Sequence, residues 1–186
     1  MRVIAGRWGG RTLVAPAGAA TRPTADRVRE ALFSVLADVE GETVLDLYAG
    51  TGALGIEALS RGAVHATFVE NARPALRALR QNIHVLGLGD VTTVLPIAVE
   101  RALKTPPWRG EGFDLVFLDP PYAVLRAGRF TGALAGALER GLASSLRPGG
   151  RIILEHASVE DAPPVAGITL QKTRVYGDTA LSFYLR

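Results

Sequence analysis

The segment with the clearest chemistry is Asp119-Pro120-Pro121-Tyr122. Leu115 to Asp119 has the pattern of a buried parallel strand that ends in a carboxylate, and the two prolines prevent sheet or helix from continuing. Ligands of open α/β sheets bind at the carboxyl ends of the strands. We therefore expect Asp119 and Tyr122 to be presented at a ligand-binding edge.

The atoms of this turn indicate what it could bind. Asp119 and the carbonyl groups of Pro120 and Pro121 are acceptors, and the prolines contribute no N–H. Tyr122 adds a flat ring that could stack on a base with about 1–3 kcal/mol. The natural guest is the exocyclic amino group of a nucleobase. A strand followed by a proline turn with an aromatic plug would give the same tetrapeptide without any such role.

A second candidate site follows the apolar strand predicted over Thr43–Leu47. Gly50, Gly52 and Gly55 match the G-x-G-x-x-G pattern, and a helix over Ala53–Arg61 comes next. Glu70 ends the following strand, 20 residues after Gly50, at the spacing of an acid that accepts ribose hydroxyls. The arrangement predicts a nucleotide cradle, in which glycine lets the backbone touch the ligand.

The remaining pattern places these sites in an α/β fold. After the strand Ala66–Val69 we expect the helix Arg73–Leu86, the strand Val91–Leu95, the short helix Val99–Lys104, the helix Phe130–Leu146, a turn at Pro148–Gly150, the strand Arg151–Glu155 and a closing hairpin of Ile168–Tyr176 with Thr179–Leu185. Hairpin strands are antiparallel, so the sheet is mixed. Ile97 and Ala98 follow the third strand, where a backbone could frame an adenine.

The amino-terminal segment carries the positive charge. Met1–Glu30 contains two acids and six arginines, which are Arg2, Arg7, Arg11, Arg22, Arg27 and Arg29. The net charge of this segment is therefore +4, and because the whole chain has a net charge of +3, the remaining residues sum to −1. We expect a small hairpin of Arg2–Ile4 with Thr12–Val14, and a helix from about Ala25 with Thr24 as its N-cap. Trp8 at the hairpin tip could stack on RNA or pack as a lid. Arginine forks bind phosphate, although a charged run is often only a solvated face.

Composition sets the limits. The chain has 186 residues, 48% of them hydrophobic and 21% charged, which indicates one globular domain with no transmembrane or signal segment. A cytoplasmic location is the expectation. The absence of cysteine excludes disulfides and thiolate chemistry, and His65, His84 and His156 lack paired-ligand spacing, so we expect no metal.

Taken together, the glycine turn, Glu70, the Asp-Pro-Pro-Tyr turn and the closing hairpin resemble class I S-adenosylmethionine-dependent methyltransferases that methylate amino groups. More narrowly, Met1–Gly6, Arg22–Phe33 and Asp46–Gly62 resemble the bacterial 16S ribosomal RNA guanine-N2 methyltransferases of the small subunit. The resemblance covers nearly the whole chain. It implies a Rossmann-like, seven-stranded, mostly parallel sheet with an antiparallel carboxyl-terminal hairpin.

The resemblance also implies roles for individual residues. The cofactor-binding residues would be Asp46, Ala49, Gly50, Thr51 and Gly52 around the methionine part of S-adenosylmethionine, Glu70 at its ribose, and Asn71 and Ala98 at its adenine. The catalytic residues would be Asp119, Pro120, Pro121 and Tyr122, which would hold the target guanine. From the positive charge of the amino-terminal segment, not from the resemblance, we expect Arg7, Arg11, Arg22, Arg27 and Arg29 to bind RNA. Tyr48 stands where phenylalanine is common, and Ile97-Ala98 lacks the acid that many methyltransferases place there.

The resemblance further implies a partner and a division of the chain. The substrate would be 16S ribosomal RNA in a 30S or pre-30S particle, at a guanine of the position-966 type. Residues 1–37 would form an RNA-binding hairpin and helix packed on a catalytic domain of residues 38–186. We expect a monomer, since no long apolar face is left over.

Two other functions remain open from the residues. A DNA adenine-N6 methyltransferase would use the same acceptor turn, but such enzymes usually carry a sizeable recognition insert, and every loop here is short. A nucleotide-binding module without catalysis, or a nicotinamide enzyme, would explain the glycines and Glu70. It would leave Asp119–Tyr122 without a role.

Overall fold

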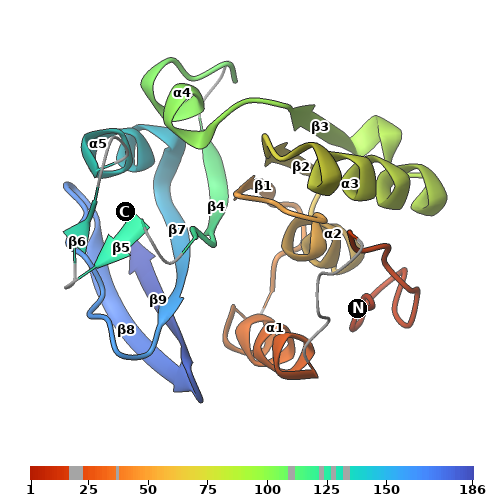
Figure 1. Ribbon diagram of the computed structural model, residues 1–186, viewed down its shortest axis with the longest axis horizontal. Coiled ribbons are helices and arrows are strands. Elements are labelled where there is room, and N and C mark those ends of the chain that lie inside the picture. Colours follow the sequence, from red (N-terminus) through yellow and green to blue (C-terminus); the bar gives the residue numbers. More distant parts are fainter. Residues whose placement is uncertain (17–22, 37, 109–111, 122–123, 127–128, 132–134) are drawn as a thin grey trace. The chain divides into compact units, whose positions relative to one another are not determined.

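A computed structural model describes residues 1–16, 23–36, 38–108, 112–121, 124–126, 129–131 and 135–186 (Figure 1). The chain forms two compact units, Met1–Pro96 and Ile97–Arg186. Its strands make a seven-stranded, mixed and mostly parallel sheet and a separate antiparallel pair. The predicted Rossmann-like α/β class, with its antiparallel carboxyl-terminal hairpin, is confirmed.

The first unit contains three parallel strands in the order β3-β2-β1. Its elements are α1 (Pro23–Leu36), β1 (Thr43–Leu47), α2 (Ala53–Ser60), β2 (His65–Val69), α3 (Arg73–Leu86), the 3₁₀ turn η1 (Gly89–Val91) and β3 (Thr92–Leu95). Leu47 pairs with Val69, and Val69 pairs with Leu95. Because the three strands end in register, the residues that follow β1 and β2 emerge at the same edge.

Hydrophobic spacing explains how the helices of this unit pack. In α3 the side chains of Leu76, Leu79, Ile83 and Leu86 are buried, as the helical period predicted. α3 ends at Gly87, whose φ of 66° lies in the left-handed region that favours glycine at a helix end. The sequence therefore fixes both which face of this helix is buried and where the helix stops.

The amino-terminal hairpin is present as a single antiparallel bridge between Arg2 and Thr12. The Val3 N–H donates to the Arg11 carbonyl at 2.9 Å, and the Leu13 N–H donates to the Met1 carbonyl at 3.0 Å. Val3 and Leu13 are both buried, so the hairpin is part of the first unit's core. α1 begins at Pro23, two residues before the expected Ala25.

The second unit is built on β4, β7, β9 and β8, in that order. Its elements are α4 (Val99–Lys104), β4 (Phe113–Leu118), β5 (Leu125–Arg126), β6 (Arg129–Phe130), α5 (Ala135–Ser145), β7 (Leu146–Ala157), β8 (Thr169–Tyr176) and β9 (Thr179–Leu185). β4 and β7 are parallel, whereas β9 runs antiparallel to both β7 and β8. Figure 1 shows the long blue strands β7, β8 and β9 side by side. The closing hairpin was predicted to within one residue.

Two predictions in this unit were wrong. The predicted helix Phe130–Leu146 is only α5, because Phe130 pairs with Leu125 in the small β5–β6 sheet and is buried there. Pro148–Gly150 is not a turn but an irregular part of β7, at which the register with β4 shifts. The Gly149 N–H donates to the Arg186 carbonyl at 3.1 Å, so a backbone neighbour holds this segment in the sheet.

In the described part of the chain, no helix has both the length and the apolar character that a membrane crossing requires.

Candidate cofactor and substrate sites

The carboxylate of Glu70 holds the glycine-rich turn together. Its Oε2 accepts the Gly50 N–H at 2.9 Å, and its Oε1 accepts the N–H groups of Asn71 at 2.8 Å and Ala72 at 2.7 Å. The structure thus brings together Gly50 and Glu70, the two residues that the 20-residue spacing had singled out. A carboxylate has about four acceptor positions, so Glu70 can still accept a hydroxyl.

Asp46, the next-to-last residue of β1, accepts a hydrogen bond from the far end of the glycine-rich segment. It is 1% exposed, and its Oδ2 accepts the Gly55 N–H at 3.0 Å in the first turn of α2. A carboxylate at a helix N-terminus is stabilised by the unpaired N–H groups there. Asp46 and Glu70 therefore fix the two ends of the turn that connects β1 to α2.

The three glycines of the motif are needed for different structural reasons. Gly50 and Gly52 have φ values of 56° and 81°, in the left-handed region. A Cβ at Gly52 would lie 2.4 Å from Leu79 Cδ1, and one at Gly55 would lie 2.4 Å from Phe68 Cε1. A Cβ at Gly50 would meet only the Tyr48 carbonyl, at 3.9 Å. The expectation that the glycines leave room for a ligand fits Gly50, whereas Gly52 and Gly55 are required by internal packing.

The other predicted cofactor residues lie in varied surroundings. Ala49 is buried and its N–H donates to the Val69 carbonyl at 3.1 Å. Thr51 is buried, and its hydroxyl contacts Met1 Sδ at 3.5 Å. Asn71 is exposed directly after Glu70. Ala98 belongs to the second unit, where it precedes α4 in an extended conformation.

This donor set fits a nucleoside-containing cofactor in two respects. The turn after β1 offers backbone at Gly50 with no side chain in the way, and Glu70 supplies a partly exposed carboxylate beside it. Asn82 steadies the turn from α3, because its buried amide donates to the Thr51 carbonyl at 3.0 Å and to the Val14 carbonyl at 3.1 Å. The sequence did not predict this role for Asn82, since a buried amide in a helix has no sequence signature.

The acceptor turn follows β4 directly. Asp119 is exposed, Pro120 is buried and Pro121 is exposed. The Pro121 carbonyl accepts the Val124 N–H at 2.8 Å, which closes the turn. Tyr122, predicted to stack on the target base, lies outside the described residues. The described part of the turn therefore presents a carboxylate and lacks two backbone donors, as its sequence requires.

A second carboxylate, which the sequence did not lead us to predict, lies beside Asp119. β4 and β7 pair in parallel with Leu118 opposite Leu154, so Asp119 and Glu155 are the next residues on adjacent strands. Burial and the negative charge of Asp119 raise the pKa of Glu155 to about 8, and burial raises the pKa of Asp119 to about 6. Residue Asp119 is nevertheless exposed, so solvent limits the rise of its pKa, and Glu155, whose pKa is raised further, is the acid of the pair that favours the protonated form.

A cavity of about 200 Å³ opens next to this pair within the second unit. It is lined by Pro120, Leu125, Arg126, Glu155, His156, Ala157 and Glu160. His156 is 5% exposed and is committed elsewhere: its Nδ1 is 3.0 Å from the Ala157 carbonyl and its Nε2 is 2.8 Å from Ser182 Oγ. Since a carbonyl only accepts, Nδ1 carries the proton, and both ring nitrogens of His156 have hydrogen-bond partners within the protein.

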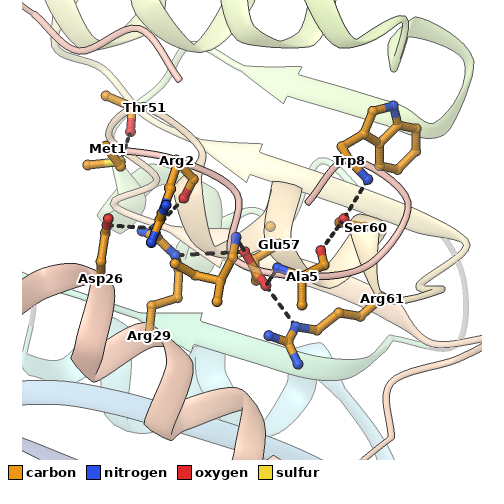
Figure 2. Close-up of polar contacts among 12 residues, drawn as sticks. Met1, Arg2, Ala5, Trp8, Asp26, Arg29, Thr51, Glu57, Ser60 and Arg61 are labelled. Atoms are coloured by element: carbon orange, nitrogen blue, oxygen red, sulfur yellow. Dashed lines mark hydrogen bonds and ion pairs between the residues drawn. The ribbon is translucent and has the colours of Figure 1, made fainter. Parts of the chain in front are cut away.

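The predicted RNA-binding arginines divide into exposed and buried members. Arg7, Arg11 and Arg27 are exposed, and Arg22 lies outside the described residues. Arg29 is 5% exposed; its Nη2 donates to the Arg2 carbonyl at 2.6 Å and to Asp26 Oδ1 at 2.9 Å (Figure 2). Arg29 is therefore not available to RNA, and its assignment to that surface is corrected. The cause is its helical position, about 200° from Arg27.

Glu57 anchors the amino-terminal hairpin to α2. This residue is fully buried and accepts the N–H of Ile4 at 2.7 Å, the N–H of Ala5 at 3.1 Å and Arg61 Nε at 2.8 Å. Ser60 Oγ accepts the Trp8 N–H at 3.0 Å and donates to the Ala5 carbonyl. Figure 2 shows these contacts around the hairpin. They hold Arg7 and Trp8 on the first unit, with the Arg7 guanidinium 4.9 Å from the centre of the Trp8 ring.

Comparisons with known proteins agree with this architecture over the full length. The family model described as "Conserved hypothetical protein 95" matches residues 1–185. YlbH of Bacillus subtilis is 37% identical, covering 99% of this chain and 98% of its own. "Ribosomal RNA small subunit methyltransferase D" of Escherichia coli strain K12 is 34% identical over 100% and 90% of the two chains. The solved structure of yhhF from Escherichia coli is 35% identical, has a TM-score of 0.82 and covers 100% and 97%.

Proposed function

Since the chain belongs to the family described as "Conserved hypothetical protein 95", whose relatives include ribosomal RNA methyltransferases, we propose that it methylates the exocyclic N2 of a guanine in 16S ribosomal RNA. The proposed substrate is a small-subunit assembly particle, 30S or pre-30S, in the cytoplasm, and the proposed nucleotide is of the position-966 type. The cofactor is S-adenosylmethionine, the methyl donor of methyltransferases with this fold.

The observation that carries the choice of an amino group is the composition of the turn after β4. Asp119 is an exposed carboxylate, and Pro120 and Pro121 follow it without an N–H between them. An amine hydrogen can be accepted there, whereas a carbonyl or phosphate oxygen would find no backbone donor. The DNA adenine-N6 alternative loses support because the relatives named above match the whole chain without a recognition insert.

The residues of the second unit would act mainly by positioning. The lone pair of guanine N2 is delocalised into the ring, so the amine must be held with its nitrogen directed at the methyl carbon. Asp119 accepts one N2 hydrogen and a proline carbonyl can accept the other. S-adenosylmethionine supplies an electrophilic methyl on a sulfonium. When bound, the cofactor would supply the methyl group and keep the electron pair of the S–C bond at sulfur, while Asp119 would hold N2 in line with that methyl and accept the proton that N2 releases. Such orientation is worth several orders of magnitude in rate.

The residues of the first unit would hold the cofactor. Glu70 would accept ribose hydroxyls, and Gly50, at which a side chain is absent, would let the backbone approach the ligand. Asp46, Ala49, Thr51 and Gly52 would shape the methionine end, and Asn71 with Ala98 the adenine. The exposed cations Arg7, Arg11 and Arg27, together with Arg22, would bind the RNA backbone, and Tyr122 would stack on a base turned out of its RNA context.

The proposal is tested with tritiated S-adenosylmethionine and 30S particles from cells that lack this protein. We expect one methyl group per particle and, after nuclease digestion, N2-methylguanosine at a single position by mass mapping. Particles from cells that contain the protein should accept no label, because the site is already modified. Label in adenosine, or label transferred to duplex DNA at a comparable rate, would overturn the proposal.

A further inference from the structure

The neighbour of Asp119 at the carboxyl edge of the second unit has no role in the mechanism above. Glu155 follows Leu154, which pairs with Leu118, so its carboxyl group emerges next to that of Asp119. Glu155 and Pro120 line the same cavity of about 200 Å³. A carboxyl group in this position lies beside the turn that would receive the target amine, within reach of the same base edge.

We propose that Glu155 binds the N1–H and O6 of the target guanine, its carbonyl oxygen accepting N1–H and its hydroxyl donating to O6, while Asp119 accepts from N2. This inference rests on the proposed guanine-N2 activity. N1–H and O6 of guanine form a lactam, with a donor and an acceptor side by side. A protonated carboxyl group offers the complementary acceptor and donor in the same plane.

The surroundings of Glu155 favour the protonated form. Burial and the charge of Asp119 raise the pKa of Glu155 well above the ordinary value of a glutamic acid. Two adjacent carboxylates that share a site tend to share one proton, and the more exposed Asp119 is the one that ionises. An ionised Asp119 accepts the N2 hydrogen, so the pair matches all three groups along the guanine edge.

Three other polar side chains, those of Arg126, His156 and Glu160, line the same cavity. Arg126, on β5, is exposed, so solvent screens its charge. His156, which follows Glu155 on β7, is bound to Ser182 and to the Ala157 carbonyl. Glu160, from the segment after β7, is another acid in the lining and brings no positive charge. None of these groups provides the buried cation that would keep Glu155 ionised.

The variant Glu155→Gln distinguishes this role from that of a proton acceptor. A glutamine carboxamide has the same shape as a neutral carboxyl group, and it also offers a carbonyl acceptor and an N–H donor. We expect Glu155→Gln to methylate 30S particles within about threefold of the wild-type rate at pH 7, and Glu155→Ala to be at least about tenfold slower, since it loses two hydrogen bonds.

The pH profile sharpens the test. The wild-type rate should fall as the pH rises through about 8, as Glu155 ionises, whereas Glu155→Gln should lack this fall. Any ionisation of the guanine itself is common to both proteins, so the difference between them belongs to Glu155. Asp161→Asn, at an exposed acid outside the cavity, is the matched control and should follow the wild-type profile.

Each failure has its own signature. If Glu155→Gln is as slow as Glu155→Ala at every pH, Glu155 acts as a base or an ionic acceptor and the inference is wrong. If both variants keep the wild-type rate and profile, Glu155 does not contact the base. If the wild-type protein itself produces no N2-methylguanosine, the proposed function fails. Thermal unfolding of each variant, read by circular dichroism, shows that a lost rate is not lost folding.

Discussion

The turns that follow β1 and β4 hold equivalent positions after parallel strands but have opposite compositions. Each begins where a buried parallel strand ends, at the edge of the sheet where ligands bind. The turn after β1 is rich in glycine and bends through left-handed backbone at Gly50 and Gly52. The turn after β4 contains Pro120 and Pro121, which remove two backbone donors. The first suits a ligand that touches the backbone, and the second suits one that donates hydrogens.

The acids beside the two turns also differ, in how far the protein itself compensates their charge. Glu70 accepts three backbone N–H groups, so its charge is compensated by the turn that it stabilises. Asp119 and Glu155 lie beside each other, and their raised pKa values show that their charges are poorly compensated within the protein. Glu70 is therefore an acid that stabilises its own turn. A pair that is not satisfied is available to a substrate.

Asp119→Ala should produce the largest effect and should act on the second turn alone. Loss of a charge-assisted hydrogen bond worth about 1.5–3 kcal/mol predicts a methyl-transfer rate at least about tenfold lower. Affinity for S-adenosylhomocysteine, measured by calorimetry, should be nearly unchanged. Asp161→Ala is the control at an exposed site. An unchanged turnover in Asp119→Ala would remove this carboxylate from the site.

Substitution of two glycines separates packing from ligand contact in the first turn. Gly52→Ala should lower the free energy of unfolding by about 1–3 kcal/mol, because its Cβ would collide with Leu79 and its φ is 81°. Gly50→Ala meets open space, so only the backbone strain of about 1 kcal/mol applies. Urea unfolding measures both changes. Equal losses for the two variants would mean that the turn is not divided in this way.

Much of this comparison was readable from the sequence. The bounds of β1, α3 and α4 and the spacing of Gly50 and Glu70 follow from hydrophobic period and turn chemistry, which are local properties. The β5–β6 pair could not be predicted, because strands of two residues have no measurable alternation. These strands form because Leu125 pairs with Phe130 in the folded chain.

The missed side chains share one cause, which is dependence on a partner distant in sequence. Gly52 and Gly55 are required by Leu79 and Phe68, and neither contact is visible in a glycine pattern. Charge counting placed Arg29 with the RNA-binding arginines, although burial removes it from the surface. Glu155 could have been found, since it ended a predicted strand at the same edge as Asp119. What was missing was the register of β4 with β7.

The acid pair also predicts how stability depends on pH. Asp119 and Glu155 have raised pKa values in the folded state, so between the ordinary carboxyl range and about pH 8 the folded protein binds more protons than the unfolded chain. Their contribution to stability is present at low pH and is lost as the pH rises through about 6 and then about 8. Urea midpoints between pH 5 and 9 should therefore fall more steeply for the wild type than for Glu155→Gln. Parallel curves would mean that Glu155 is ionised throughout.

The smallest expected effect on activity or binding lies outside both turns, on helix α1. Arg27 and Arg29 lie on the same helix, but Arg27 is exposed and Arg29 is buried against Asp26 and Glu57. Arg27→Ala should weaken binding to 30S particles several-fold and reduce the salt slope by about 1, because one phosphate contact is lost. Arg29→Ala should instead lower the urea midpoint, since it removes one cationic partner from the buried Glu57 and leaves a cavity where the buried guanidinium lay. Filter binding at several salt concentrations measures the first change. If Arg27→Ala binds as the wild type does at every salt concentration, α1 presents only a solvated face, and the RNA surface must be sought at Arg7 and Arg11.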